Sequence, residues 1–136
     1  MAQTQEILNE GIKEIILLAS GGAASAVTKI VCMTDSTPCT AAKTSTHAAP
    51  ADTLVTDSGL ASQAIDTVSQ DTTNTTGDTL TFDHVFTATG TKNVSGIQVV
   101  NDDGDCSFVE CCFNAILAFE SDDTLTIDGA LVLDQA

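Results

Sequence analysis

Two histidines, His47 and His84, are the residues best suited to acid–base chemistry near neutral pH, because unperturbed imidazole titrates in that range. His84 alternates with Phe82 and Phe86 along an apolar, strand-like segment, which is typical of a packed histidine. His47 lies among alanine, threonine and proline, where a solvated side chain is expected. The chain has no G-x-S-x-G motif, and Asp57-Ser58-Gly59 is typical of a turn. We therefore predict no catalytic residues and no cofactor.

Carboxylates and thiols are the next candidates, because both bind metal ions. Asn101 to Asp105 is acidic, and Glu110 lies six residues beyond Gly104, as in a calcium-binding EF-hand loop. Asn101 and Cys106 interrupt the alternate oxygen ligands, however, and no flanking helices are predicted. The cysteine spacings also differ from the paired C-x-x-C elements of zinc sites. We predict no metal site, and the sequence leaves open whether the Asn101 to Asp105 turn binds a cation.

The five cysteines allow two interpretations. In the first, all are reduced and pack as small apolar residues. In the second, an outward thiol, Cys112 or Cys106, cross-links neighbouring subunits or pairs with the Cys32–Cys39 segment in an oxidising medium. Cys111 and Cys112 are adjacent on a predicted strand and should face opposite sides. The candidates for a disulfide or cross-link are Cys32, Cys39, Cys106, Cys111 and Cys112.

One helix is predicted near the N-terminus, from Thr4 to Ala19. Thr4 is expected to cap it, Glu6 lies in its first turn, and Gly21-Gly22 supplies a left-handed stop. Gly11 weakens the helix by about 1 kcal/mol relative to alanine, so packing must hold it. We therefore expect a docking helix that lies on a sheet or on a neighbouring subunit. Its apolar stripe consists of Leu8, Ile12, Ile15, Ile16 and Ala19.

The chain after this helix is predicted to be mostly strand and turn, because β-branched residues dominate and 21 residues are threonine. The segment from Asp35 to Asp52 lacks periodicity and is expected to be an exposed loop where a partner binds. The final strand contains Gly129 as a bulge or close-approach point. The predicted strands are Val27 to Met33, Ala61 to Gln70, Thr79 to Thr89, Val94 to Val100, Ser107 to Phe119, and a last strand through Leu125, Ile127, Leu131 and Leu133. This pattern predicts one domain over residues 1–136, mainly β, with an antiparallel β-sandwich or jelly-roll-like fold and one N-terminal α-helix.

Composition excludes several classes of partner. The 136 residues carry 4 lysines, no arginine and 19 carboxylates, which gives a net charge of -15. Arginine guanidinium groups usually bind phosphate in a bidentate manner, and a negatively charged protein repels polyanions. Nucleic acid is therefore not an expected partner. No run reaches the roughly 20 apolar residues of a membrane-spanning helix. The acidic segment Met1 to Glu10 is the reverse of a secretory signal. We expect neither a membrane partner nor secretion through a signal peptide.

Three segments of the second half carry a family resemblance: Asp78 to Thr91 (DTLTFDHVFTATGT), Val94 to Ile97 (VSGI) and Ser121 to Ile127 (SDDTLTI). They resemble the C-terminal half of small structural proteins, tail-fibre-like or head-decoration, of tailed bacteriophages and related archaeal viruses. The helix and double glycine from Leu8 to Gly22 match the usual beginning of such proteins. The resemblance implies a virion protein, made in the host cytoplasm, whose partners are copies of itself and the major capsid or tail proteins. The segment with Cys106, Cys111 and Cys112 departs from the family pattern, so the resemblance implies no cross-link.

These observations predict a non-enzymatic virion structural protein, a capsid decoration or head/tail accessory subunit that self-associates and stabilises the particle. A threonine-rich sandwich with few long side chains loses little side-chain freedom on assembly, and its edge strands can pair with neighbours. One alternative is a subunit of an extracellular filament assembled by strand addition. Another is a small-ligand-binding or hydrolytic domain that uses His84 or His47.

Overall fold

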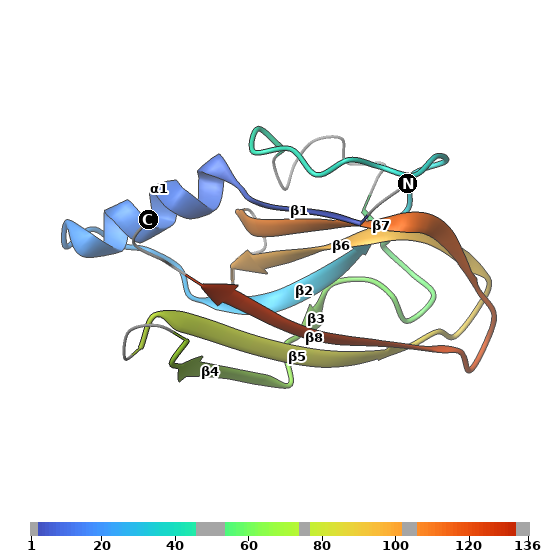
Figure 1. Cartoon of the computed structure of the whole chain (residues 1–136). Helices are drawn as coiled ribbons and strands as arrows, with labels where there is room; N and C mark the ends of the chain where they lie inside the picture. The colour runs from blue at the N-terminus through green and yellow to red at the C-terminus, as the bar shows by residue number, and fades with distance from the viewer. Residues whose placement is uncertain (1–2, 46–53, 74–76, 102–105, 133–136) are drawn as a thin grey trace.

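The computed structural model describes residues 3–45, 54–73, 77–101 and 106–132 (Figure 1). Within these residues, eight strands form two antiparallel sheets, and a single helix lies near the N-terminus. The predicted mainly β fold is confirmed, and the arrangement is consistent with a β-sandwich. The elements are β1 (Thr4–Ile7), α1 (Asn9–Ala19), β2 (Val27–Met33), β3 (Gln63–Ala64), β4 (Thr67–Asp71), β5 (Thr79–Thr87), β6 (Lys92–Asn101), β7 (Ser107–Phe119) and β8 (Thr124–Val132).

The larger sheet has five strands in the order β1-β7-β6-β2-β3, and every neighbouring pair is antiparallel. Strands β2 and β7 have the predicted bounds. The pairing of β6 with β7 shifts between Val94, opposite Leu117, and Gly96, opposite Cys112. This irregularity is the bend or bulge that the length of β7 leads one to expect.

The smaller sheet has the order β4-β5-β8. Along β5, Phe82, His84 and Phe86 are buried, whereas the residues between them are exposed, so the predicted alternation is confirmed. The prediction of one strand from Ala61 to Gln70 is wrong, because the chain crosses between the sheets there. The Ile65 N–H donates to Thr28 next to the larger sheet, and the Asp66 N–H donates to Asp83 in the smaller one.

The main core contains buried side chains from both sheets. It includes Ile30 and Cys32 of β2 and Phe86 of β5. Gly129 on β8 lies beneath the Phe82 ring, since a Cβ atom at this glycine would be 2.4 Å from the ring carbons. The predicted role of Gly129 as a close-approach point is therefore confirmed.

The N-terminal boundary of the helix differs from the prediction. Thr4–Ile7 forms β1, which pairs with the edge of β7, so neither Thr4 nor Glu6 belongs to the helix. The Thr4 hydroxyl accepts a hydrogen bond from the Ala41 N–H (2.9 Å) and caps no helix; Leu8 is the N-cap residue and makes no side-chain cap. Tertiary pairing with β7 has overridden local helix propensity. At the other end, Gly21 has φ of 76°, as predicted for a left-handed stop.

Within the described part of the chain, no helix has the length and apolar character needed to cross a lipid bilayer.

Candidate functional site

The predicted docking helix, α1, has one side fixed to the sheet and one side open. A Cβ atom at Gly11 would lie 2.7 Å from the Phe108 Cα, so the helix backbone rests directly on β7. Leu8 is fully buried just before the helix, and Ile15 is half-buried. Sequence reasoning counted Gly11 only as a weakness, although a glycine inside a helical pattern often has a packing role.

The open side is a short apolar stripe that we term the exposed helix face, made of Ile12, Ile16 and Ala19. Ile12 is 44% exposed and Ile16 is 62% exposed. The two isoleucines are four residues apart and therefore lie side by side on the helix surface. The structure thus divides the predicted stripe: Leu8 and Ile15 are turned toward the body, whereas Ile12, Ile16 and Ala19 are exposed among the described residues.

A cavity of about 390 Å³ lies beside α1, toward the smaller sheet. Its apolar lining includes Ile15, Leu18, Leu80 and Phe108. This volume falls in the usual range for small-molecule sites, but such sites also need convergent polar groups. Polar side chains in the described lining include Glu14, Gln70 and Asp78, and no histidine or cysteine belongs to it.

The structure buries His84, as expected for a packed histidine. Its ring meets Phe86 edge to face, with centroids 4.4 Å apart. Its Nδ1 lies 3.1 Å from Oδ2 of Asp66, a contact without the alignment of a hydrogen bond. The same carboxylate oxygen accepts the N–H of Val85 (3.1 Å). His47 lies outside the described residues.

Asp57-Ser58-Gly59 forms the predicted turn. Ser58 and Gly59 both have positive φ, 57° and 73°. Lys92 pairs with Asp57 at 2.6 Å, and this contact holds the pKa of the Asp57 carboxyl below its usual range. The Ser58 hydroxyl donates to the adjacent Asp57 carboxylate (3.1 Å), and the Leu60 N–H donates to the Asp57 carbonyl (3.1 Å) across the turn.

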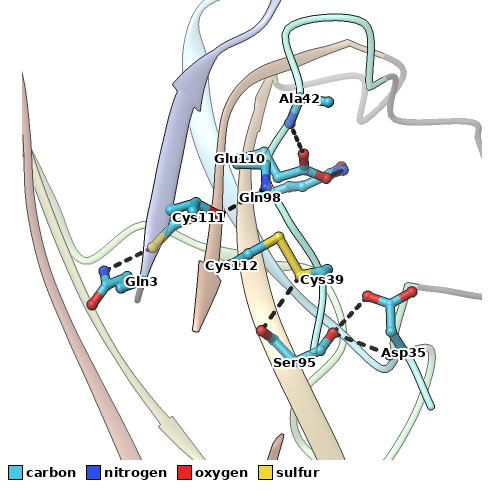
Figure 2. Close-up of a disulfide and its surroundings, with 11 residues drawn as sticks. Gln3, Asp35, Cys39, Ala42, Ser95, Gln98, Glu110, Cys111 and Cys112 are labelled. Carbon is cyan, nitrogen blue, oxygen red and sulfur yellow. Dashed lines mark hydrogen bonds between the residues drawn. A yellow bond between two sulfur atoms is a disulfide. The ribbon is translucent and has the colours of Figure 1, made fainter. Parts of the chain in front are cut away.

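A disulfide joins Cys39 to Cys112, 73 residues apart (Figure 2). Of the two interpretations, the second is therefore correct in pairing Cys112 with the Cys32–Cys39 segment. The prediction that Cys112 or Cys106 points outward is wrong, because both are buried. Cys112 faces the side of the larger sheet that the loop from residue 34 to 45 covers, which explains its burial.

Three cysteines form no disulfide bond: Cys32, Cys106 and Cys111. Cys111 faces away from Cys112, as predicted, and is half-buried. Its sulfur accepts a hydrogen bond from Gln3 Nε2 (3.0 Å). Burial raises the pKa of Cys111, an effect that the hydrogen bond partly offsets, and burial raises the pKa of Cys32 to about 12.

The loop from residue 34 to 45 is attached to the outer face of the larger sheet by polar contacts as well as by the disulfide (Figure 2). The buried Ser95 hydroxyl donates to the Asp35 carboxylate (2.7 Å) and accepts the Asp35 N–H (3.0 Å). The Glu110 carboxylate accepts the Ala42 N–H (3.1 Å) and a hydrogen bond from Gln98 (3.3 Å). Of the predicted exposed loop from Asp35 to Asp52, residues 46–52 lie outside the described residues. In the described part, residues 36–38, 40 and 42–44 are exposed as predicted, whereas Ala41 is buried and Asp35 and Cys39 are half-buried.

The described residues contain no group of three or more His, Cys, Asp or Glu side chains placed to hold a metal ion. Of the Asn101 to Asp105 turn, residues 102–105 lie outside the described residues. The Asn101 side-chain oxygen accepts the Cys106 N–H (3.2 Å).

Comparison of the chain with protein-family models, with curated proteins and with solved structures finds no match.

Proposed function

We propose that this protein is a non-enzymatic structural subunit of a virion, a capsid decoration or head/tail accessory protein that self-associates and stabilises the particle. The observation that carries the proposal is the exposed helix face on a helix whose opposite side is locked to β7.

The exposed helix face leaves apolar surface of Ile12 and Ile16 in contact with solvent. Full burial of one large aliphatic side chain is worth roughly 1.5–3 kcal/mol, and Ile12 and Ile16 leave much of this unrealised. Because Gly11 fixes the helix on β7, a partner that covers this face orders little extra chain when it binds. A fixed apolar stripe is suited to permanent contact between subunits.

The virion setting is supported by the segments Asp78 to Thr91, Val94 to Ile97 and Ser121 to Ile127, which resemble small phage and archaeal-virus structural proteins. These segments lie in β5, in β6 and at the turn into β8. The partners in this setting are further copies of the chain and the major capsid or tail protein, and the acidic surface remains toward solvent.

The test compares Ile16→Asp with a matched control, Val68→Asp, which places the same charge at a 41% exposed residue of edge strand β4. We expect sedimentation equilibrium to show oligomers for the wild type and the control but monomers for Ile16→Asp. The unfolding free energy of Ile16→Asp should stay within about 0.5 kcal/mol of the wild type, because the side chain is exposed in the monomer.

The virion setting needs a second measurement: immunogold electron microscopy of particles from the source of the protein. Labelled capsids or tails, together with co-sedimentation, are the expected result. A wild-type protein that is monomeric at all concentrations and never sediments with particles would contradict the proposal.

A second candidate is a filament subunit that adds strands in trans, which the free edge of β8 favours. Filaments labelled in the same micrographs, without any capsid, would support this candidate instead.

A further inference from the structure

A groove of about 590 Å³ lies between the edge strands β1 and β8, one from each sheet. One wall contains seven consecutive residues of β8, Leu125 to Leu131. Inward and outward side chains alternate along a strand, so a groove lined by every residue follows the free backbone edge of β8. The other wall contains Gln5 and Ile7 from β1 and Val109 and Cys111 from β7.

The groove marks a place where the larger sheet is incompletely covered. The larger sheet has five strands and the smaller has three. The inward residues Val109, Cys111 and Phe113 of β7 are only half-buried, whereas Val94 and Val99 of the neighbouring β6 are at most 1% exposed. One more strand beside β8 would cover this row of β7 and complete the core.

Among the described residues no strand pairs with the outer edge of β8. Although this edge carries one charged residue, Asp128, it lacks most of the features that normally prevent pairing. Its nine residues pair with β5 in an unbroken register from Thr124 to Val132. It contains no proline and no lysine, and no bulge interrupts it. Natural edge strands are usually short, bulged or protected by such residues. The edge strands β1, β3 and β4 are short, with 4, 2 and 5 residues, so β8 is the exception among the described edges.

A second copy of the chain is disfavoured as the occupant of the groove, because two copies that each carry a net charge of -15 repel one another.

The charge of the groove and of the whole chain indicates which kind of segment binds there. The described lining contains two charged residues, Glu6 and Asp128, and both are acidic. The whole chain has a net charge of -15, so a basic partner is attracted and an acidic one is repelled.

We propose that the groove between β1 and β8 accepts an extended basic segment of another protein, which pairs with the free edge of β8 as a fourth strand. Apolar side chains at every second position enter the groove, and lysine or arginine side chains between them face solvent. The nine residues of β8 offer a pairing length of roughly 30 Å. Only the identification of the partner as a capsid or tail protein rests on the proposed function.

The experiment uses three labelled peptides of the same length as β8: alternating valine and lysine, alternating valine and glutamate, and the valine–lysine peptide with a central proline. Fluorescence anisotropy measures binding, and hydrogen exchange measures protection of the β8 amides. Alkylation of Cys111, the half-buried free thiol in the groove wall, reports coverage of the groove. We expect only the uninterrupted valine–lysine peptide to bind, to protect β8 and to slow Cys111 alkylation.

Two charge variants make the test specific. Asp128→Lys in the groove wall should weaken binding of the valine–lysine peptide by about tenfold. Asp71→Lys changes the net charge equally but lies on β4, at the other edge of the smaller sheet, and should leave the affinity close to that of the wild type.

Three results would overturn the inference: no binding of the valine–lysine peptide, equal weakening by both variants, or binding that leaves β8 exchange and Cys111 alkylation unchanged. Slower Cys111 alkylation at high protein concentration without peptide would assign the groove to a second copy and would also overturn it. The Ile16→Asp variant should bind the peptide as the wild type does, because the substitution lies on α1 and not in the groove. Loss of self-association and loss of peptide binding are therefore observed separately.

Discussion

At the scale of single residues, Gly11 has opposite effects on its helix and on the packing of that helix. Glycine in a helix interior costs about 1 kcal/mol relative to alanine. The same residue allows the backbone of α1 to rest on β7, where a Cβ atom would lie 2.7 Å from the Phe108 Cα and 2.9 Å from its carbonyl oxygen. Both obstacles are backbone atoms, which cannot move aside as a flexible side chain would.

Gly11→Ala should therefore destabilise the protein by a net 1–3 kcal/mol, roughly the cost of overpacking, despite its better helix propensity. Urea unfolding followed by circular dichroism gives the free energy. Gly90→Ala is the matched control, since a Cβ atom there meets only the Ser58 side chain at ordinary contact distance. A Gly11→Ala variant as stable as the wild type would show that α1 can shift on the sheet without cost.

The buried Cys32 thiol makes the unfolding free energy of the protein decrease at alkaline pH. Burial raises the pKa of Cys32 from 9.0 to about 12, so the unfolded chain loses this proton at lower pH than the folded chain does. The contribution is fully present below pH 9.0 and is lost as the pH rises toward about 12. Between these values the unfolding free energy should fall by about 1.4 kcal/mol per pH unit from this group.

Cys32→Val, which keeps an apolar side chain of similar size, should remove this part of the slope. The difference between the unfolding free energies of wild type and variant, measured at several alkaline pH values, isolates it from lysine titration. Parallel pH profiles for the two proteins would contradict the assignment.

At the scale of elements, the disulfide and the hydrogen bonds of Ser95 and Glu110 attach the loop from residue 34 to 45 to the larger sheet. Cys39 and Cys112 are 73 residues apart, so the bond restricts more than half of the unfolded chain. A bond that closes a loop of this length stabilises a protein mainly by constraining the unfolded state.

The double variant Cys39→Ser with Cys112→Ser should lose about 2–4 kcal/mol of unfolding free energy. The wild type in a reducing agent should lose a similar amount, whereas the double variant should not respond to the reducing agent. Urea unfolding with and without reductant measures both. Equal stability of the oxidised wild type and the double variant would contradict the role given to the bond.

How far the sequence predicts these elements depends on the distance of their partners along the chain. Strands β2 and β7 were predicted with their observed bounds, because alternation is a local signal. Strand β1 was missed because its partner, β7, lies about a hundred residues away, and TQEI has no strong signal of its own. The pairing of Cys39 with Cys112 and the groove beside β8 depend on strand order, which periodicity does not contain. The apolar stripe of α1 was predicted, but which of its sides is covered depends on the contact of Gly11 with β7.

At the scale of the whole molecule, the net charge of -15 acts in opposite directions on the two proposed surfaces. Copies that meet through the exposed helix face repel one another, whereas a basic segment is drawn toward the groove between β1 and β8. Raising the salt concentration from ~0.01 M to ~1 M shortens the screening length from about 30 Å to about 3 Å.

Self-association should therefore strengthen with salt, and binding of the valine–lysine peptide should weaken. Sedimentation equilibrium and anisotropy across one salt series measure the two trends on the same preparation. Trends of the same sign would show that one of the two surfaces is misassigned.

The disulfide between Cys39 and Cys112 forms only under oxidising conditions, so its formation depends on where the chain is after synthesis. Thiols stay reduced in most cytosols, so a newly synthesised chain there carries both sulfurs unjoined and holds its loop by non-covalent contacts alone. If the protein is the virion subunit proposed above, release from the cell exposes both sulfurs to oxygen or to an oxidised small thiol, which can close the bond. The polypeptide would then become harder for proteases to digest, and its maturation would be completed outside the host cell without any host enzyme.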